Sequence, residues 1–255
     1  MSVWKSSSIK LVSLNIEKSK HLDRVLPFLA RRLPDVFCVQ ELFERDIRLF
    51  SDMLGGDSAY VPMTRRVNET PPEPQGIGIF SRLPILGKQV RYYQRTPGRI
   101  PDSDTRDRST FRDNDYVVLA ADVEKDGTPF RIATTHFTWT PDGKPDDLQR
   151  AHVGKLLAIL ERLGEFVACG DFNAPRGGEI FGMLAARYKD NIPARYATSI
   201  DVSLHRAGRT KPRELEDKMV DGLFSTPGYA VSDVELACGV SDHCAIVASV
   251  AKARP

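Results

Sequence analysis

Eleven short runs rich in β-branched and aromatic residues limit the fold of this chain more than any other feature, because such runs predict strands. Strands outnumber helices, and no change in composition divides the chain. We therefore expect an α/β (α+β) protein in which residues 1–255 form a single domain. The predicted strands are residues 9–15, 36–41, 59–63, 76–81, 88–93, 116–123, 130–136, 166–171, 219–224, 231–236 and 244–250.

Two longer segments repeat apolar residues at the spacing of a helix. The first follows Ser19, which we expect to be its N-cap, and ends before Pro34. The second starts near Asp146 and is closed by Gly164. Shorter helices are predicted at residues 43–54 and 179–186.

The charge of the chain is nearly balanced, with 36 Lys and Arg residues against 34 Asp and Glu residues. A net charge of +2 argues against a nucleic-acid binder held mainly by overall basicity. The apolar content of 41% excludes collagen, coiled-coil and disordered classes. No apolar run is long enough for a signal-peptide core or a membrane span, so we expect a monomeric cytoplasmic protein.

Four cysteines lie far apart or beside apolar runs, and none belongs to a Cys-x-x-Cys pair: Cys38, Cys169, Cys238 and Cys244. This spacing gives no support for a zinc site. We expect all four to be reduced core residues, in keeping with a reducing compartment.

Three polar connections are longer than usual for a compact domain and therefore suggest function: residues 64–75, 94–114 and 198–217. The middle one is basic, since residues 86–112 contain seven Lys or Arg against three Asp. Two interpretations stay open for this segment, a solvated loop and a surface that contacts an anionic substrate.

Polar residues stand at the ends of several predicted strands: Asn15, Glu41, His136 and Asp171, with Asn173, Asp242 and His243 close by. One such residue is usually only a turn former. The whole set is harder to explain in that way, because ligand sites of α/β sheets form where strand ends converge. Oxygen ligands without thiolates suit Mg²⁺, Mn²⁺ or Ca²⁺ rather than zinc.

Six short motifs occur in an order that is similar to the endonuclease/exonuclease/phosphatase superfamily, which has the deoxyribonuclease-I-like fold. The resemblance covers residues 9–250 and implies a four-layer α/β sandwich, with two mixed β-sheets packed face to face and helices outside. It also implies metal-dependent hydrolysis of a phosphoester. The motifs are Leu14-Asn15-Ile16, Val39-Gln40-Glu41, the Gly76–Ser81 segment, Thr135-His136-Phe137, Gly170-Asp171-Phe172-Asn173 and Ser241-Asp242-His243-Cys244-Ala245.

The resemblance implies a metal site for Mg²⁺ or Mn²⁺. Glu41 resembles its principal ligand, since a carboxylate is a hard donor. Asn15 can offer an amide oxygen to the metal or bind the phosphate. Asp242 belongs to the metal shell, directly or through water.

The remaining motif residues resemble catalytic groups. Asp171 resembles the aspartate that orients and deprotonates the attacking water, and Asn173 fixes that geometry. His136 and His243 are donors for charge that develops on the phosphate oxygens. Asp221 matches the carboxylate that pairs with His243 and raises its pKa.

The chain departs from the family pattern after Asp221, where Gly222 replaces a larger residue. Thr135-His136 disfavours a conventional abasic-site endonuclease, because that branch tends to carry Tyr nearby. Two further residues are candidates for substrate binding. Trp139 could stack on a base, and Arg176 could contact a phosphate, although packing and solvent exposure explain them as well.

The leading functional hypothesis is a metal-dependent phosphodiesterase or nuclease acting on nucleic acid, most simply DNA or a DNA end. An alternative keeps the chemistry and changes the substrate to a phospholipid, an inositol phosphate or another small phosphoester. A non-enzymatic binding protein is disfavoured, because the metal and base carboxylates are all present.

Overall fold

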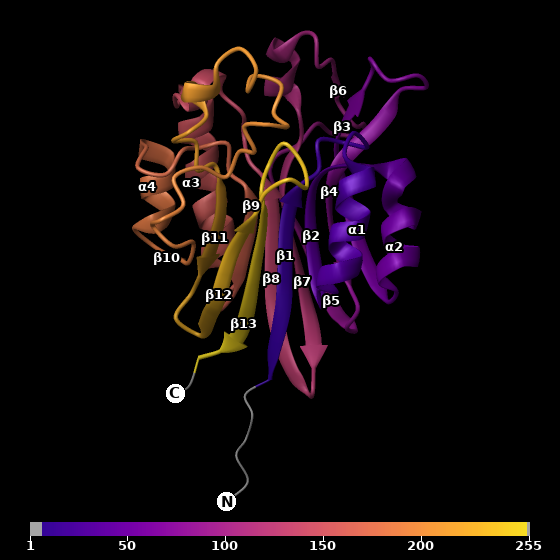
Figure 1. The fold of residues 1–255 in the computed structure, drawn as a ribbon, viewed down its shortest axis with the longest axis vertical. Helices are drawn as coiled ribbons and strands as arrows, with labels where there is room; N and C mark the ends of the chain where they lie inside the picture. Colours follow the sequence, from indigo (N-terminus) through magenta and orange to yellow (C-terminus); the bar gives the residue numbers. More distant parts are fainter. Residues whose placement is uncertain (1–6, 254–255) are drawn as a thin grey trace, which may run out of the picture.

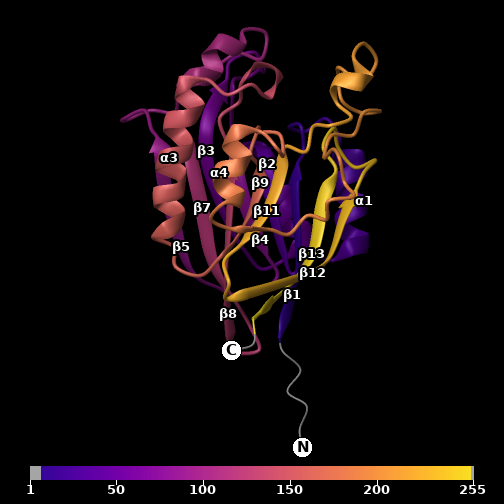
Figure 2. The ribbon, with the colours of Figure 1, turned by 90° about the vertical axis from the view of Figure 1, so that its left-hand side faces the viewer.

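Two β-sheets lie face to face between helices in the computed structural model, which describes residues 7–253 (Figures 1 and 2). Part of the amino-terminal segment considered for a signal peptide therefore lies outside the described residues. Sheet A has seven strands in the order β12 (Tyr229–Ala237), β13 (Ala245–Lys252), β1 (Ser8–Asn15), β2 (Val36–Phe43), β4 (Glu73–Ser81), β3 (Asp57–Arg66) and β6 (Asp102–Ser103). Sheet B has six, in the order β10 (Lys189–Asp190), β11 (Asp221–Ser225), β9 (Val167–Asp171), β8 (Thr128–His136), β7 (Tyr116–Lys125) and β5 (Ile85–Gln94).

The helices form the two outer layers (Figure 2). Short 3-10 helices interrupt the connections at Glu44–Asp46, Arg108–Asp113, Pro141–Gly143 and Pro212–Glu214. The predicted four-layer sandwich is confirmed, and all eleven predicted strands are present. The two-residue strands β6 and β10 were not predicted, because they are too short to leave a pattern. The α-helices are α1 (Leu22–Arg32), α2 (Ile47–Leu54), α3 (Asp147–Glu161) and α4 (Glu179–Ala185).

The apolar runs of sheet A are continuous because both faces of that sheet are buried. In β1, Ile9 and Leu11 face the core between the sheets, whereas Val12 and Leu14 belong to a second core that also holds Val25 of α1. Successive side chains of a strand point to opposite faces, so one run supplies both cores. Asn15 continues the alternation of Ile9 and Leu11 and is buried at the end of the strand.

Helix α3 begins as predicted. The carboxylate of Asp146 accepts a hydrogen bond from the backbone N–H of Gln149 at 2.8 Å. The predicted N-cap of α1 is wrong, because that helix starts only at Leu22. The Ser19 hydroxyl donates instead to Asp46, which lies beside α2.

The expected long loop at residues 64–75 is mostly a hairpin. Strand β3 continues to Arg66 and β4 starts at Glu73, and these two residues pair directly. This segment was predicted as a polar connection, but Pro74 lies in β4 close to its start, where the sheet tolerates proline.

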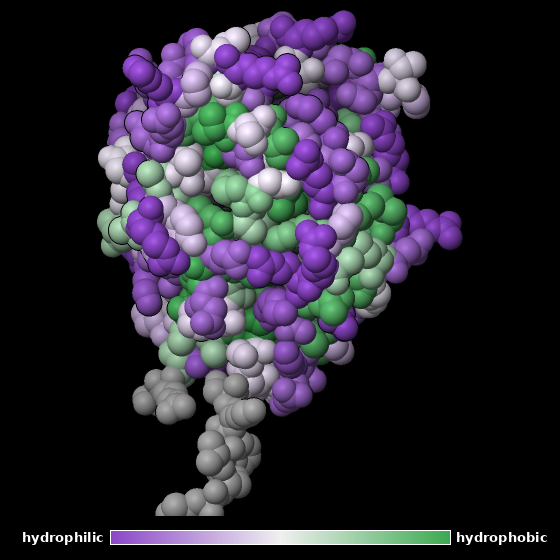
Figure 3. Space-filling view, in the orientation of Figure 1, coloured by the Kyte–Doolittle hydropathy of each residue, from purple (hydrophilic) through white to green (hydrophobic). Residues whose placement is uncertain are grey.

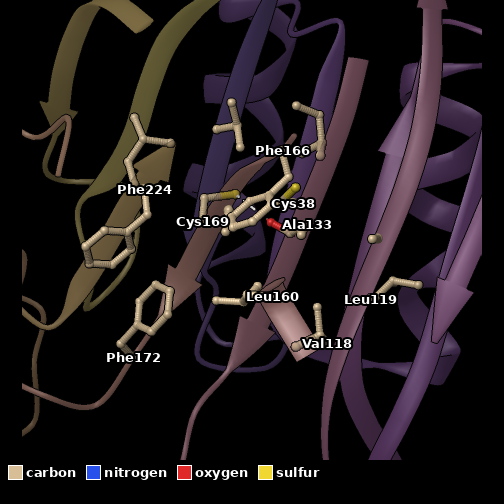
Figure 4. Packing of buried hydrophobic residues seen from close by; sticks show 14 of the residues in the cluster. Cys38, Val118, Leu119, Ala133, Leu160, Phe166, Cys169, Phe172 and Phe224 are labelled. Atoms are coloured by element: carbon tan, nitrogen blue, oxygen red, sulfur yellow. Dashed lines mark hydrogen bonds between the residues drawn. The ribbon is translucent and has the colours of Figure 1, made fainter. Parts of the chain in front are cut away.

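The prediction that all cysteines are reduced is wrong for Cys238 and Cys244, which form a disulfide. They flank the turn between β12 and β13, and the pairing of Ala237 with Ala245 brings them together. Cys38 and Cys169 are free and buried as predicted (Figure 4). Burial raises the pKa of the Cys38 thiol, so it stays protonated.

Candidate active site

One rung of sheet B brings three predicted residues together. His136 of β8 pairs in parallel register with Asp171 of β9, and Asp171 pairs in antiparallel register with Asp221 of β11. Paired residues of neighbouring strands project from the same face of a sheet. The register alone therefore places an imidazole and two carboxylates side by side at the end of the strands.

Sheet A meets this rung through Asn15. Its Nδ2 donates to Asp171 Oδ2 at 3.1 Å and to Glu41 Oε1 at 3.4 Å. The side-chain oxygen of Asn15 accepts the backbone N–H of Glu17 at 3.1 Å. One amide thus links the carboxylates of the two sheets.

Glu41 lies at an irregularity of β2. The register with β4 shifts between Val39 and Leu42, and Glu41 has a φ of 59°, which is unusual for a residue other than glycine. Such a bulge redirects side chains near functional sites. Gln75 of β4 holds the residue in place, since its Nε2 donates to Glu41 Oε2 at 3.2 Å and to the Glu41 carbonyl at 3.3 Å.

His243 lies between the two aspartates of the rung. Its Nδ1 is 2.7 Å from Asp221 Oδ2, and its Nε2 is 3.8 Å from Asp171 Oδ2. His136 Nε2 lies 3.5 Å from the same Asp171 oxygen. Asp171 is therefore flanked by two imidazoles, and we call these four residues (His136, Asp171, Asp221 and His243) the histidine group.

Gly222 leaves Asp221 undisturbed. A Cβ at this position would lie 2.7 Å from the ring of Phe224 and 2.8 Å from that of Phe172. These two rings pack edge to face at 5.2 Å and occupy the room that a larger residue would need (Figure 4). The departure from the family pattern is thus compensated by aromatic packing.

The charges of the histidine group are coupled. Burial would lower the pKa of His243, but Asp221 and Asp171 raise it well above its usual value, so the imidazole is protonated at neutral pH. Burial raises the pKa of Asp171, with Asp221 adding to the increase and His243 and His136 opposing it.

Glu41, Asp242 and Glu17 form a second set of carboxylates, which we call the acidic group. Burial would raise the pKa of Glu41, but His136, Arg66 and Lys18 together hold it below its usual value. Burial raises the pKa of Asp242 to about 7, and the negative charges of Glu17 and Glu41 contribute.

The donor chemistry of the acidic group fits a divalent cation. The charges of Glu17 and Glu41 raise the pKa of Asp242, and carboxylates that repel one another gain from a positive ion between them. Asn15 contacts Glu41 through Nδ2, while its side-chain oxygen accepts the Glu17 N–H. Donor atoms of Asp171, Asp221 and His243 also lie within 4.8 Å of one another. Among residues 7–253, these three form the group of His, Cys, Asp and Glu side chains whose donor atoms converge in this way.

The comparison with known families decides the relationship of this chain. Its residues 12–243 match the model of the endonuclease/exonuclease/phosphatase family. The chain belongs to this family. Family members are hydrolases that act on phosphoesters, so the described group lies in a phosphoester hydrolase fold. No curated protein matches the sequence.

Solved structures of the family have the same fold at low sequence identity. A Bacteroides vulgatus endonuclease/exonuclease/phosphatase is 16% identical with a TM-score of 0.71, and the match covers 97% of this chain and 100% of that one. A mannosyl-6-phosphatase of Bacteroides thetaiotaomicron is 14% identical with a TM-score of 0.63, covering 96% and 100%. The catalytic domain of human Nocturnin is 17% identical with a TM-score of 0.66, covering 96% and 95%.

Asn173 lies next to the histidine group, as the family motif implies. Its backbone N–H donates to Asp171 Oδ1 at 2.8 Å, and its side-chain amide donates to the Phe137 carbonyl at 2.9 Å. Its φ of 49° turns the chain sharply after β9. The side chain of Gln149 in α3 donates to the Asn173 carbonyl at 3.3 Å and stabilises this turn.

The two candidate substrate-binding residues make their side-chain contacts with other parts of the chain. Arg176 pairs with Asp190 at 2.8 Å and donates to the Ile192 carbonyl at 2.9 Å, so its guanidinium faces β10. Trp139 packs against Phe111 and lies under the guanidinium of Arg108, 5.0 Å from the ring centroid. The structure does not bring Arg176 into contact with the predicted catalytic residues.

Sequence reasoning missed the residues that hold Glu41 and Asp221. Arg66 Nε donates to the side-chain oxygen of Gln75, and Ser199 Oγ accepts the backbone N–H of Asp221 at 3.0 Å. Arg66 and Gln75 come from the misread hairpin, and Ser199 from the start of a loop. No motif marks them, because their role depends on which strands become neighbours.

Proposed function

We propose that this protein is a divalent-metal-dependent phosphodiesterase that acts on nucleic acid, with DNA or a DNA end as the first candidate. The observation that carries the proposal is the buried carboxylate of Asp171 between two imidazole nitrogens at 3.5 and 3.8 Å. During the transfer of a phosphoryl group to water, the water loses a proton while negative charge develops on the phosphate oxygens. A base flanked by two hydrogen-bond donors suits this reaction.

In this proposal Asp171 orients the attacking water and takes its proton. The raised pKa of Asp171 makes it a stronger base than an exposed aspartate. Asn173 holds one oxygen of Asp171 through its backbone N–H, which leaves the other oxygen toward the imidazoles. His243, kept protonated by Asp221, donates to the phosphate oxygens, and His136 donates from the other side.

Glu41, Asn15 and Asp242 would hold the metal ion. A bound Mg²⁺ or Mn²⁺ would polarise the phosphate and stabilise the leaving oxygen. The histidine group is the less suitable site for the ion. His243 is protonated and its Nδ1 is hydrogen-bonded to Asp221, so neither imidazole nitrogen is free to bind a cation. Gln75 fixes the orientation of the Glu41 carboxylate, because its Nε2 donates to Glu41 Oε2.

Basic residues near the site support a substrate with several phosphates. The positive charges of Lys18 and Arg66 help to lower the pKa of Glu41. The charge of Arg206 reaches both His205 and Arg108. Hydrophilic side chains also cover much of the upper end of the molecule in Figure 3, where the long loops lie. Such local charge favours a polyanion even when the net charge is only +2.

The purified protein should be incubated with Mg²⁺ or Mn²⁺ and single-stranded, nicked and end-blocked DNA, RNA, and a set of sugar phosphates and inositol phosphates. We expect cleavage of at least one DNA substrate, loss of activity with EDTA, and a large loss of activity in Asp171→Asn. Hydrolysis of small phosphoesters without cleavage of any nucleic acid would overturn the nucleic-acid part. Full activity in EDTA would overturn the metal requirement.

A further inference from the structure

The contact between Asp221 and His243 joins the two sheets. Asp221 is the first residue of β11 in sheet B, whereas His243 lies just before β13 in sheet A. The ladder hydrogen bonds of neither sheet set the distance of 2.7 Å between Asp221 Oδ2 and His243 Nδ1, because β11 and β13 pair with strands of different sheets. Other contacts must therefore hold the two residues at hydrogen-bonding distance.

Residues 199–201, which we call the clip segment, contact the sheet B side of this pair. The Ser199 hydroxyl oxygen accepts the backbone N–H of Val220 at 3.1 Å and that of Asp221 at 3.0 Å. The Ser199 N–H donates to the Lys218 carbonyl at 3.1 Å. Ser199 is fully buried, so bulk water does not compete for these N–H groups.

The clip segment also contacts the sheet A side of the pair. The Ser199 carbonyl accepts the Cys244 N–H at 2.7 Å, and Ile200 forms a β-bridge with His243. Figures 1 and 2 show the orange loop of residues 198–217 next to the yellow turn between β12 and β13. One residue, Ser199, thus binds the start of β11 through its side chain and the start of β13 through its backbone.

Asp201 holds the turn between β12 and β13 from the other end of the clip segment. Its backbone N–H donates to the Asp242 carbonyl at 2.9 Å, and its Oδ2 accepts the Gly239 N–H at 2.6 Å. Its Oδ1 accepts the N–H groups of Ser203 at 2.9 Å and Leu204 at 3.2 Å. The buried carboxylate therefore joins this turn to the loop of residues 198–217.

We propose that Ser199 and Asp201 are positioning residues, which hold Asp221 and His243 at hydrogen-bonding distance across the two sheets. Ser199 fixes the backbone of Asp221, and Asp201 fixes the turn that carries His243. This inference rests on the proposed function, in which His243 donates to the phosphate oxygens. Because both residues act through the pair and not on the substrate, their loss should lower kcat and leave KM nearly unchanged.

Steady-state kinetics with Mn²⁺ and the activated phosphodiester bis(p-nitrophenyl) phosphate test this proposal. Ser199→Ala should lower kcat about 10-fold with KM within a few-fold of the parent value, and Ser199→Thr, which keeps the hydroxyl, should recover part of the rate. If Ser199→Ala does not fold, Ser199→Cys replaces it, since a thiol is a weaker acceptor of similar size. A normal kcat in the folded variant would overturn the role of Ser199.

Ser225→Ala is the matched control. Ser225 is the last residue of β11, is equally buried, and its hydroxyl oxygen accepts Asn191 Nδ2 at 3.0 Å. This variant also loses a buried hydrogen bond, but at the opposite end of the strand from Asp221, so its kcat should stay at the parent value. An equal fall of kcat in Ser225→Ala and Ser199→Ala would assign the effect to general stability and overturn the proposal.

A double-mutant cycle shows whether Ser199 acts through Asp221. Ser199→Ala added to Asp221→Asn should cause little further loss of kcat, because the pair is already broken. Two effects that multiply in full would overturn the proposal. Asp201→Asn should lower kcat about 3- to 10-fold, since one amide oxygen cannot serve both sets of N–H groups. A normal kcat in Asp201→Asn would remove Asp201 from the proposed role.

The proton between His243 and Asp221 gives a readout that needs no substrate. A proton shared by an imidazole nitrogen and a buried carboxylate has an NMR signal far downfield, and its loss in Asp221→Asn assigns it. Ser199→Ala should shift or broaden this signal, whereas Ser225→Ala should leave it unchanged. An unchanged signal in Ser199→Ala would overturn the proposal. If the protein cleaves no nucleic acid, the proposed function fails, while this signal still tests the clip segment on its own.

Discussion

The acidic group and the histidine group lie at the same end of the sandwich, yet their carboxylates differ in their hydrogen-bond contacts. In the histidine group, Asp221 and Asp171 face imidazoles, and His243 becomes a lasting cation. In the acidic group, burial raises the pKa of Asp242 to about 7, the negative charges of Glu17 and Glu41 add to the increase, and His243 opposes it. The difference teaches that one group carries its own positive charge, whereas the other is suited to receive a cation from solution.

The largest effect should come from the base. Asp171→Asn keeps the shape and removes the proton acceptor, so kcat should fall by about 10³–10⁴-fold. The affinity for Mn²⁺ should stay within a few-fold of the parent value, since Asp171 is assigned to the histidine group. Steady-state rates and calorimetric titration check this together. A variant that keeps a tenth of the parental rate would remove Asp171 from this role.

The next effect should come from the acidic group. Glu41→Gln should lower activity by about 10²–10³-fold at a fixed metal concentration, and added metal should recover part of it, because a ligand is weakened. Glu44→Gln is the matched control, as Glu44 is exposed three residues later. If metal concentration has no influence on the defect, Glu41 acts in another way.

A smaller effect is expected for the partner of His243. Asp221→Asn removes the carboxylate 2.7 Å from Nδ1, so the pKa of His243 should fall and the rate should drop about 10²-fold. The pKa can be followed by NMR titration of the imidazole. An unchanged pKa in this variant would show that Asp171 alone keeps His243 protonated.

Most of the histidine group could be predicted from the sequence, because its residues belong to strands. The runs before His136 and Asp171 predict parallel neighbours, and their ends then meet without any knowledge of loops. The family resemblance added Asp221, which pairs with Asp171 across an antiparallel strand.

The surroundings of Glu41 could not be predicted in the same way. The bulge in β2, the hairpin that supplies Arg66 and Gln75, and the disulfide between Cys238 and Cys244 all depend on which strands become neighbours.

The smallest effect concerns His152, a buried imidazole of α3. It forms no ion pair with a carboxylate among residues 7–253, in contrast to His243. Its Nδ1 lies 2.7 Å from the Thr138 hydroxyl and its Nε2 lies 3.0 Å from the Gln94 side chain. The pKa of His152 is lowered to about 4, and burial is the largest cause of this shift. The folded protein thus keeps His152 neutral where the unfolded chain takes up a proton.

The unfolded chain binds the additional proton as pH falls below about 6.5, so His152 should cost stability between there and pH 4 and have no effect above that window. The loss at pH 4.5 should be about 2 kcal/mol, and His152→Gln should flatten this part of the curve. Urea unfolding at several pH values measures it. The same slope in the variant would assign the acid sensitivity to other groups.

Metal titration tests the division of the site into two groups most directly. Mn²⁺ binding should be measured by calorimetry for the parent protein, Glu41→Gln and Asp221→Asn. The account predicts that Glu41→Gln weakens binding by about 10-fold or more, while Asp221→Asn leaves it within a few-fold. The opposite pattern, with binding lost in Asp221→Asn and kept in Glu41→Gln, would place the ion among Asp171, Asp221 and His243 and contradict the account.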